Sequence, residues 1–319
     1  MDLSIVISVY NEEESLKELV SWIDNTFKNS KYKYEIIIVD DGSTDNSWSV
    51  ICELSESYPI NAISFRRNYG KSAALYCGFE LAQGKYIATM DADLQDSPQE
   101  IPEMISILEK DGLDLISGWK KKRHDGLFTK NIPSKIYNRT ARWVTKIKLH
   151  DMNCGLKVYR KEVVKNIEVY GEMHRYIPYL SKNAGFSKIG EKAVIHQARK
   201  YGKSKFGANR FINGFLDLLS LWFLSRFGKK PMHFFGLIGS LTFLFGGGTS
   251  LYLIIDKVIT QSQGLKYRPV TDQPLFYIAL TAIIIGMQLF LSGFIAELIS
   301  RNSGERNVYK IKNRISNKF

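Results

Sequence analysis

The sequence predicts an α/β fold in which a mostly parallel sheet is covered on both faces by helices and is followed by a membrane anchor. Three observations lead to this prediction. In roughly the first 200 residues, strand-like apolar runs alternate with segments of helical periodicity, which is typical of a parallel sheet. Several of these apolar runs end in acidic residues. The last third of the chain contains two long segments without a charged residue.

The alternation starts at residues 3–10, which have the composition of a buried strand, and continues with helical periodicity in residues 12–29. Three further strand and helix pairs follow, and one more strand ends the series. Apolar strands of this kind are typical of parallel sheets, in which both faces are covered. The later strands are predicted within 34–45, 60–67, 85–93 and 113–119, and the later helices within 47–57, 71–82 and 98–112.

Two segments near the C-terminus have the length and composition of membrane-spanning helices. Residues 232–255 and 274–296 contain no Asp, Glu, Lys or Arg, and about 20 apolar residues in a helix cross the ~30 Å hydrocarbon core. We therefore predict transmembrane helices at about 232–255 and 274–298, in preference to buried helices of a soluble core. Lys and Arg are denser outside this pair than in its connecting loop, which predicts that both chain ends lie in the cytoplasm.

The segments on either side of the two spans complete the domain organisation. Residues 206–230 carry large apolar side chains at helical spacing, which predicts an amphipathic helix in the membrane interface; a helix packed on the soluble domain is the alternative. Residues 301–319 are rich in Lys and Arg and are expected to form a basic cytoplasmic tail. Residues 1–205 are then expected to form the α/β domain, and residues 231–300 the two transmembrane helices.

Composition narrows the class of partner and the compartment. The net charge of +12 favours an anionic partner, such as phosphate, nucleic acid or an acidic membrane face. The three cysteines have no zinc-binding spacing, and their odd number suits a reducing compartment without a disulfide framework. The N-terminus lacks the basic and apolar regions of a signal peptide.

Acidic residues gather at predicted strand ends, in the segments SVYNEEE, IVDDGSTD and TMDADLQ. Since ligands bind at the carboxyl ends of parallel strands, these side chains are expected at one edge, where a divalent cation offsets their repulsion. Asp91 and Asp93 are separated by one residue, so both can face one ion, and Gln95 can add an amide oxygen. Mg2+ and Mn2+ favour such ligands. Turn and N-cap aspartates are the alternative, which is kept for Asp45 and Asp96.

Four segments in order, VISVYNEEESL, IIIVDDGSTDNS, RRNYGKSAALYCGF and IATMDADLQDSP, resemble the inverting family 2 glycosyltransferases of GT-A fold. More narrowly, they resemble the polyisoprenyl-phosphate glycosyltransferases, which include dolichyl-phosphate mannose synthases and membrane-anchored bacterial relatives. The resemblance covers about residues 1–210, and the two-span tail matches the bacterial branch. It implies inverting transfer of a sugar from a nucleotide-sugar to a membrane polyprenyl phosphate.

The resemblance also implies roles for residues on the donor side. Asp91, Asp93 and Gln95 would surround Mg2+ or Mn2+, with the two aspartates acting in catalysis through that ion. Lys71 would lie close to the donor phosphates; the alternative for this residue is a lysine on the solvated surface. The residues implied to bind the nucleotide-sugar are Tyr10, Glu12, Asp40, Asp41 and Lys71.

On the acceptor side, a phosphate needs basic residues to hold it and no base to activate it, because its second pKa lies near ~6. The segment HDMNCGLKVYR resembles a family segment but departs from it at two positions, where this chain has His150 for the usual arginine and Cys154 for the usual serine. Asp151 keeps its family position, and its expected role is to orient basic residues. His174 and Arg175 are expected in a packing or wall role. The basic candidates for phosphate binding include Lys120, Arg139, Lys157, Arg199 and Lys205, with Arg199 and Lys205 in a segment resembling one that closes over donor and lipid phosphate.

The expected partners are a nucleotide-sugar, a polyprenyl-phosphate acceptor and the bilayer, with no nucleic acid. UDP is the expected nucleotide and GDP stays open; family relatives suggest a homo-oligomer. The expected location is the inner, cytoplasmic membrane, as a multi-pass protein whose catalytic domain faces the cytoplasm. A processive polysaccharide synthase is one alternative, but Gln197 and Arg199 lack its Q-x-x-R-W spacing. A non-catalytic membrane adaptor is the other, and its expected sign, loss of the carboxylates, is not seen.

Overall fold

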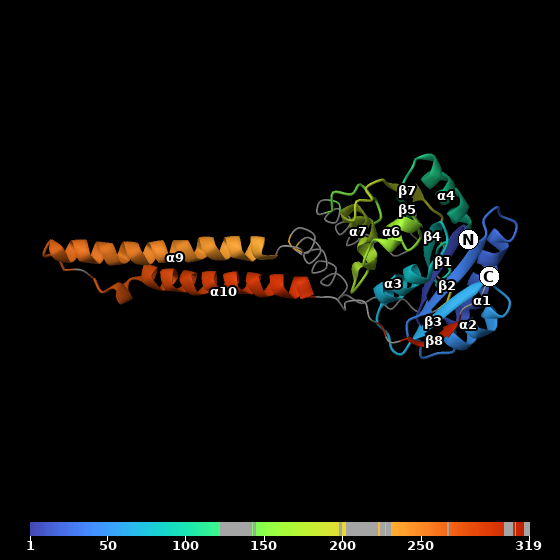
Figure 1. Ribbon diagram of the computed structural model, residues 1–319, viewed down its shortest axis with the longest axis horizontal. Coiled ribbons are helices and arrows are strands. Elements are labelled where there is room, and N and C mark those ends of the chain that lie inside the picture. The colour runs from blue at the N-terminus through green and yellow to red at the C-terminus, as the bar shows by residue number, and fades with distance from the viewer. Residues whose placement is uncertain are drawn as a thin grey trace. The chain divides into compact units, whose positions relative to one another are not determined.

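The computed structural model describes residues 1–121, 142, 145–197, 200–201, 223, 227, 231–266, 268–302, 309 and 311–315. The chain divides into two compact units. Residues 1–218 and 306–319 form the first, and residues 219–305 form the second. The predicted α/β domain is the first unit, and two long helices make up the described part of the second (Figure 1).

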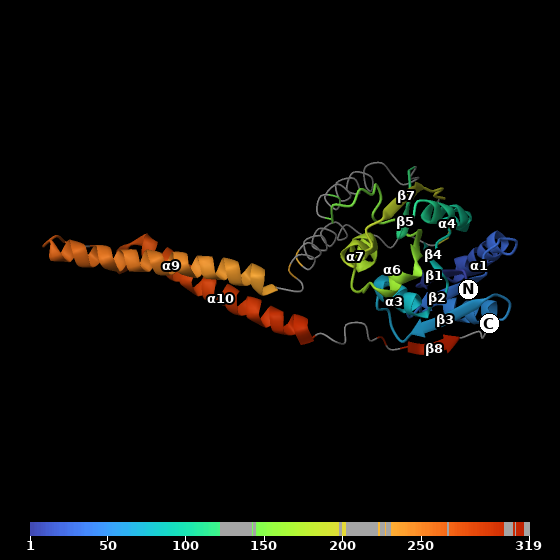
Figure 2. The same ribbon diagram turned by 45° about the horizontal axis from the view of Figure 1, so that its top comes forward.

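A single sheet runs through the described part of the first unit (Figure 2). Its central strands are parallel, as the apolar pattern predicts, and all of the predicted strands are present. The strands are β1 (Leu3–Val9), β2 (Tyr34–Asp40), β3 (Ile60–Phe65), β4 (Tyr86–Asp91), β5 (Leu115–Trp119), β6 (Lys157–Arg160), β7 (Ile189–Ala193) and β8 (Ile311–Ile315). Their order is β7-β5-β6-β4-β1-β2-β3-β8, with β6 and β8 antiparallel to their neighbours.

Helices cover both faces of this sheet. Alternate residues of β1, such as Ile5 and Ile7, belong to one core with the apolar side chains of the first, second and fourth helices. On the other face a glycine, Gly78, lets the third helix approach β1, because a Cβ there would collide with Val6. In the described part of this unit the helices are α1 (Glu13–Phe27), α2 (Ser47–Ser55), α3 (Lys71–Leu81), α4 (Ile101–Lys110), α6 (Lys161–Lys165) and α7 (Ile177–Asn183), with 3-10 turns at Pro98–Glu100 and Met173–Tyr176.

The second unit contains α9 (Pro231–Ser262) and α10 (Pro274–Asn302), joined through a 3-10 turn at Val270–Asp272. Both helices are long and apolar enough to cross a membrane, and most of their large apolar side chains are exposed. The first runs beyond the predicted end at residue 255, because Asp256 and Lys257 continue the helix instead of starting the loop. The predicted interfacial helix at 206–230 lies outside the described residues, apart from Phe223 and Phe227.

Glycines allow α9 and α10 to lie close together. A Cβ on Gly239 or Gly246 would lie 2.6–2.7 Å from backbone atoms of α10, and one on Gly286 would reach the backbone of α9. By contrast, a Cβ on Gly247 would have no atom within 4 Å. Small residues at such crossings are how membrane helices pack, since close backbone contact replaces the missing hydrophobic driving force.

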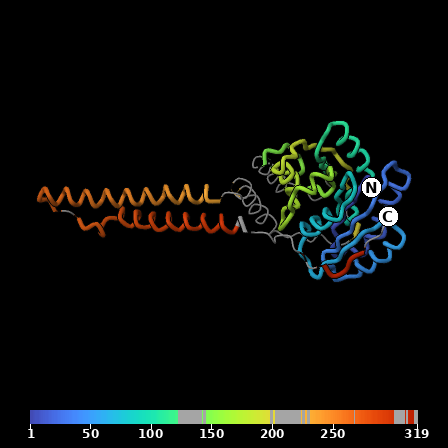
Figure 3. The backbone as a smooth tube through the Cα atoms, in the orientation of Figure 1, coloured from blue at the N-terminus to red at the C-terminus, as the bar shows by residue number. Residues whose placement is uncertain are grey.

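The end of the chain differs from the basic tail that its charge predicts. Residues 311–315 form β8, which pairs antiparallel with β3 and belongs to the first unit. In Figure 3 this red C-terminal strand lies beside the blue strands of the N-terminal third. The physical reason is that β3 would otherwise be an open sheet edge with unpaired backbone groups. The chain therefore leaves the first unit, forms the helix pair and returns to the same unit.

The glycine contacts predict how a larger side chain at the helix crossing changes the stability of the pair α9 and α10. Gly286→Val should destabilise the packed pair by roughly 1–3 kcal/mol, because the new side chain must displace the backbone of α9. Gly247→Val adds the same side chain where nothing lies within 4 Å and is the matched control. Thermal unfolding of the full chain in detergent should separate the two variants; equal melting temperatures would show that α9 and α10 do not pack through Gly286.

Candidate active site

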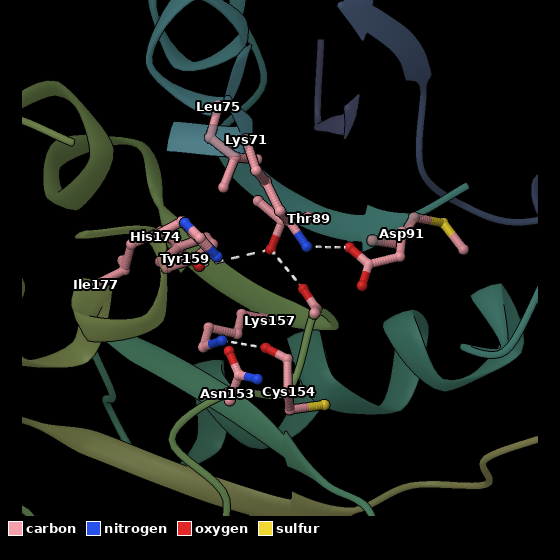
Figure 4. Close-up of a pocket in the computed structure, with 12 residues that line it drawn as sticks. Lys71, Leu75, Thr89, Asp91, Asn153, Cys154, Lys157, Tyr159, His174 and Ile177 are labelled. Atoms are coloured by element: carbon pink, nitrogen blue, oxygen red, sulfur yellow. Dashed lines mark hydrogen bonds and ion pairs between the residues drawn. The ribbon is translucent and has the colours of Figure 1, made fainter. Parts of the chain in front are cut away.

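A pocket lies at the carboxyl end of β4, at the sheet edge where β1 and β2 also end (Figure 4). Asp91 is the last residue of β4, and Lys71 is the first residue of α3. The rest of the wall comes from the segment that leads into β6 and from the turn before α7. The residues of this wall that matter below are Cys154, Gly155, Lys157 and His174.

The carboxylate of Asp91 forms an ion pair with the ammonium group of Lys71. The two side chains are 32% and 31% exposed, so a ligand from solvent can reach the pair. Partial burial raises the pKa of Asp91, but the charges of Lys71 and Lys120 outweigh this and hold that pKa well below its ordinary value of 3.8. Asp91 is therefore ionised at neutral pH. The prediction that Lys71 lies at the site, and not on the solvated surface, is in accord with this contact.

The residues that follow β4 form a strained turn. Leu94 has a φ of 60°, in the left-handed region that residues with a branched side chain seldom adopt, and its side chain is buried. Through this turn the backbone N–H of Gln95 donates to Oδ1 of Asp93 at 3.2 Å. Such strain persists where the surrounding structure enforces it, and it is concentrated at functional sites. The turn therefore fixes Asp93 directly after the strand that ends in Asp91.

The oxygen atoms at this turn fit a hard divalent cation. Asp91 and Asp93 provide carboxylates, Gln95 provides an amide oxygen, and Asp91 already attracts the ammonium group of Lys71. Within the described ranges, no group of three His, Cys, Asp or Glu side chains is placed to hold an ion alone. An ion such as Mg2+ suits this incomplete set, because it usually takes one or two carboxylates and completes its coordination with water and substrate phosphates.

Lys157 is a buried cation in the pocket wall. It is 3% exposed, and its ammonium group donates to the carbonyl oxygen of Cys154. Burial lowers the pKa of this lysine. An ammonium group has three N–H donors, and among the residues that the structure describes no carboxylate lies within 4.0 Å of it. An anion bound beside this side chain would offset the cost of burying its charged form.

His174 forms another part of the wall, which agrees with the role expected for it. Its backbone N–H donates to Oγ of Ser72 at 3.0 Å, and its ring Nδ1 lies 3.1 Å from the same oxygen. Burial and the nearby charge of Lys71 hold the pKa of His174 well below its ordinary value of 6.5. The ring is therefore neutral at physiological pH, and the double contact joins this turn to the first turn of α3.

The residues predicted to frame the nucleotide lie on two loops that are hydrogen-bonded to each other. The backbone N–H of Asn11 donates to Oγ of Ser43 at 2.9 Å, and that of Glu12 donates to Oγ of Ser47 at 3.0 Å. Tyr10, at the end of β1, is 36% exposed. The loops after β1 and β2 therefore form one connected platform at the carboxyl edge of the sheet.

Asp40 and Asp41 end β2 and have different surroundings. Asp40 is buried and accepts hydrogen bonds from the N–H of Ser43 and, at 2.7 Å, from the hydroxyl of Ser64. Asp41 accepts the backbone N–H groups of Tyr69 and Gly70 at 2.7 and 2.9 Å. Burial raises the pKa of Asp41 to about 6 in spite of these bonds. The described contacts of Asp41 thus hold the loop before α3.

Three other predicted residues are not among those that line the pocket. Lys120 forms a 2.9 Å ion pair with the fully buried Asp96, and these contacts raise the pKa of Lys120 against the effect of burial. The backbone N–H of Asp151 donates to Glu191, as does that of His150, whose ring pairs with the same carboxylate at 2.6 Å.

The same histidine stacks on Trp119 with ring centroids 4.2 Å apart, which directs it away from a phosphate role. The predicted residues Arg139, Arg199 and Lys205 lie outside the described residues.

Residues 4–168 match the family model described as Glycosyl transferase family 2. The chain belongs to this family. It is therefore a glycosyltransferase, which confirms the reaction class and the family predicted from its motifs. The acidic strand ends and the pocket beside Asp91 lie within or directly next to the matched segment.

Curated relatives match this glycosyltransferase along nearly its whole length. Dodecaprenyl-phosphate galacturonate synthase of Rhizobium johnstonii is 38% identical over 306 residues, which are 94% of this chain and 88% of that protein. Undecaprenyl-phosphate 4-deoxy-4-formamido-L-arabinose transferase of Shewanella sediminis is 35% identical over 303 residues, 94% of this chain and 87% of that protein. Coverage of this extent includes the helical unit as well as the sheet.

Solved structures confirm the predicted GT-A fold of the glycosyltransferase unit. Glucosyl-3-phosphoglycerate synthase from Mycobacterium tuberculosis, in complex with Mn2+, UDP-glucose and phosphoglyceric acid, has a TM-score of 0.52 and covers 69% of this chain and 80% of its own. The same enzyme with Mg2+ and UDP has a TM-score of 0.53, and covers 69% and 79%. Sequence identity is 17% in both, so this likeness concerns the fold.

Some residues of the site were not distinguished by the sequence. Lys157 was one of several basic candidates, and its burial alone separates it from them. Gly155 had a signal in the family-like Cys-Gly pair, but its contact is visible only in three dimensions. A Cβ on Gly155 would lie 2.7 Å from Oδ2 of Asp91, so the glycine leaves room for that carboxylate.

Gly155→Ala should therefore impair sugar transfer by displacing Asp91. We expect a loss of at least about tenfold in kcat/KM, with a stability cost of about 1–3 kcal/mol. Gly190→Ala, which would meet the side chain of Leu113 on the far edge of the sheet, is the control for crowding alone. Kinetics and melting temperature are measured together. If both variants lose activity only in proportion to stability, Gly155 has no specific role beside Asp91.

Proposed function

We propose that the protein transfers a sugar, with inversion, from a nucleotide-sugar to a membrane polyprenyl phosphate, and that UDP is the nucleotide. The observation that carries this proposal is the charge arrangement of the pocket, where one ionised carboxylate, Asp91, is accompanied by the ammonium groups of Lys71 and Lys157. Such a site has more positive than negative charge of its own, which suits phosphorylated substrates. The names of both curated relatives include a polyprenyl phosphate, which supports the lipid acceptor.

On the donor side, Asp91, Asp93 and Gln95 would hold Mg2+ or Mn2+. When bound, such an ion acts as a Lewis acid that stabilises charge on the leaving diphosphate. The proposed role of Lys71 is to donate to the same phosphate oxygens, because its ammonium group already lies against Asp91. Tyr10, Glu12 and Asp40 would bind base and ribose from the connected loops after β1 and β2. A solved structure of the same fold contains Mn2+ and UDP-glucose, which supports this arrangement.

On the acceptor side, we assign the lipid phosphate to Lys157. Its buried ammonium group has N–H donors beyond the one used by Cys154, and the phosphate brings the missing negative charge. A phosphate oxygen attacks the anomeric carbon and forms the new C–O bond, while the bond to the nucleoside diphosphate breaks. No proton has to be removed, since the acceptor is already ionised. A neutral His174 agrees with this, because no base is needed in the wall.

The membrane helices place the enzyme where its acceptor is confined. Residues 1–218 and 306–319, which lie on either side of the helix pair in the sequence, belong to one compact unit, so the pair would cross the bilayer an even number of times. With the charge bias of the flanks, this supports a catalytic unit on the cytoplasmic face of the inner membrane. Tethering to the surface raises the effective concentration of a lipid phosphate without tighter binding. A homo-oligomer remains part of the proposal.

The reaction is tested with purified full-length protein, short-chain polyprenyl phosphate and a panel of labelled UDP- and GDP-sugars. We expect label to enter chloroform-extractable lipid, and EDTA or Asp93→Ala to lower the rate by about two orders of magnitude, because leaving-group stabilisation is lost. Added Mg2+ or Mn2+ should restore the activity lost to EDTA but not the activity lost in Asp93→Ala. The exposed Asp111, at the end of α4, supplies the control variant Asp111→Asn. Label in insoluble polymer would indicate a processive synthase, and no label with any donor would indicate an adaptor.

The acceptor role of Lys157 predicts a selective kinetic effect. Lys157→Met should raise the KM for polyprenyl phosphate by about 10–100-fold, the effect of one lost charged hydrogen bond, and leave the KM for the donor nearly unchanged. Removal of a buried charge should not lower the melting temperature. Lys161→Met is the matched control, because this half-buried lysine, which does not line the pocket, also donates to a carbonyl oxygen, that of Gln83. An equal rise in both KM values would contradict the assignment.

A further inference from the structure

The aromatic ring of Tyr309, which follows the second membrane helix in the sequence, packs against three rings of the catalytic unit. Its centroid lies 5.7 Å from that of Phe65, 5.4 Å from that of Tyr69 and 6.3 Å from that of Tyr76. Phe65 is the last residue of β3, Tyr69 lies in the following loop, and Tyr76 lies on α3. One side chain thus contacts strand, loop and helix in succession, at distances typical of favourable aromatic pairs.

The loop between β3 and α3 leads directly to Lys71. The carboxylate of Asp41 accepts the N–H groups of Tyr69 and Gly70, and the next residue, Lys71, begins α3 and pairs with Asp91. The first turn of this helix has no side-chain cap, since Gly70 occupies the N-cap position with a φ of 92°. The start of α3 is therefore held by contacts from outside the helix, with Asp41 binding the loop backbone and Tyr309 contacting the loop and helix rings.

The position of Tyr309 is set by the strand that follows it. Ile311 pairs with Phe65 and Ile315 with Ala62, so β8 runs antiparallel along β3 and brings its first residues to the end of β3 that leads into the loop. Tyr309 precedes this strand by two residues. The strand register therefore brings the half-buried side chain of Tyr309 to the loop formed by residues 66–70.

We propose that Tyr309 is a positioning residue for Lys71, so that the segment after the second membrane helix completes the active site in the first unit. The tyrosine acts through the 66–70 loop and touches neither substrate nor metal ion. This inference rests on the proposed role of Lys71 at the donor phosphates. A lysine side chain is long and flexible, so the angle at which its helix starts decides where its ammonium group lies, and small displacements at such a site are costly.

Hydrogen exchange of the full chain in detergent tests the structural part without any substrate. Tyr309→Ala should accelerate exchange in the peptide that covers residues 66–75, where Tyr69 and Gly70 donate to Asp41, and Tyr309→Phe should restore protection. The control is Tyr58→Ala, which removes a half-buried tyrosine at the opposite end of β3. If Tyr309→Ala cannot be purified, Tyr309→Leu replaces it. Unchanged exchange in this peptide would overturn the proposal.

A double-mutant cycle with Lys71→Met tests the functional part. Tyr309→Ala should lower kcat/KM for the donor about tenfold in the wild-type background and have little further effect once Lys71 is gone, because the two changes remove one interaction. Tyr309→Phe should recover most of the loss, and Tyr58→Ala should add to Lys71→Met independently. If the losses in kcat/KM from Tyr309→Ala and Lys71→Met are additive, the positioning role of Tyr309 is overturned while the proposed role of Lys71 stands. A Lys71→Met enzyme with unchanged kinetics would instead contradict the proposed role of Lys71.

Discussion

The catalytic unit depends on a balance of charge at the carboxyl end of β4. A parallel sheet brings acidic strand ends to one edge, and their repulsion opposes folding unless positive charge lies among them. Lys71 meets Asp91 directly, Lys120 pairs with the buried Asp96 at 2.9 Å, and Lys157 lies in the wall of the same pocket. Two of these lysines, Lys71 and Lys157, line the pocket and are the groups proposed to bind phosphates, so one electrostatic constraint connects the stability of the unit with its proposed chemistry.

The arrangement of the loops follows from the same edge. Asp40, for example, is fixed by the backbone N–H of Ser43 in the loop that follows it and by the hydroxyl of Ser64 on β3. Asp41 uses its carboxylate to hold the loop before α3, although burial raises its pKa to about 6. Two carboxylates that are adjacent in the sequence therefore have different roles. Asp41 accepts two backbone N–H groups and holds the loop before α3, whereas Asp40 accepts one backbone N–H group and one hydroxyl group.

Local patterns in the sequence were sufficient for strands β1 to β5, helices α1 to α4, the two long apolar helices and the acidic edge, because each depends on the periodicity or composition of neighbouring residues. The partners of individual charges were beyond such reasoning, since long-range packing decides them. His150 and Lys157 are both basic residues of one segment, yet one stacks on Trp119 and the other is buried in the pocket. Likewise, the charge of residues 311–315 suggested a tail, and the open edge of β3 made them a strand.

The return of the chain to the sheet has a mechanical consequence for an enzyme with a lipid acceptor. A domain joined to the bilayer by one connection can rotate about it, whereas two connections that enter the same unit restrict that rotation. The helix pair between them is held by backbone contact at Gly239, Gly246 and Gly286, so the anchor can behave as one body. Pairing β8 with β3 thus covers the sheet edge and joins the chain on both sides of the helix pair to one unit.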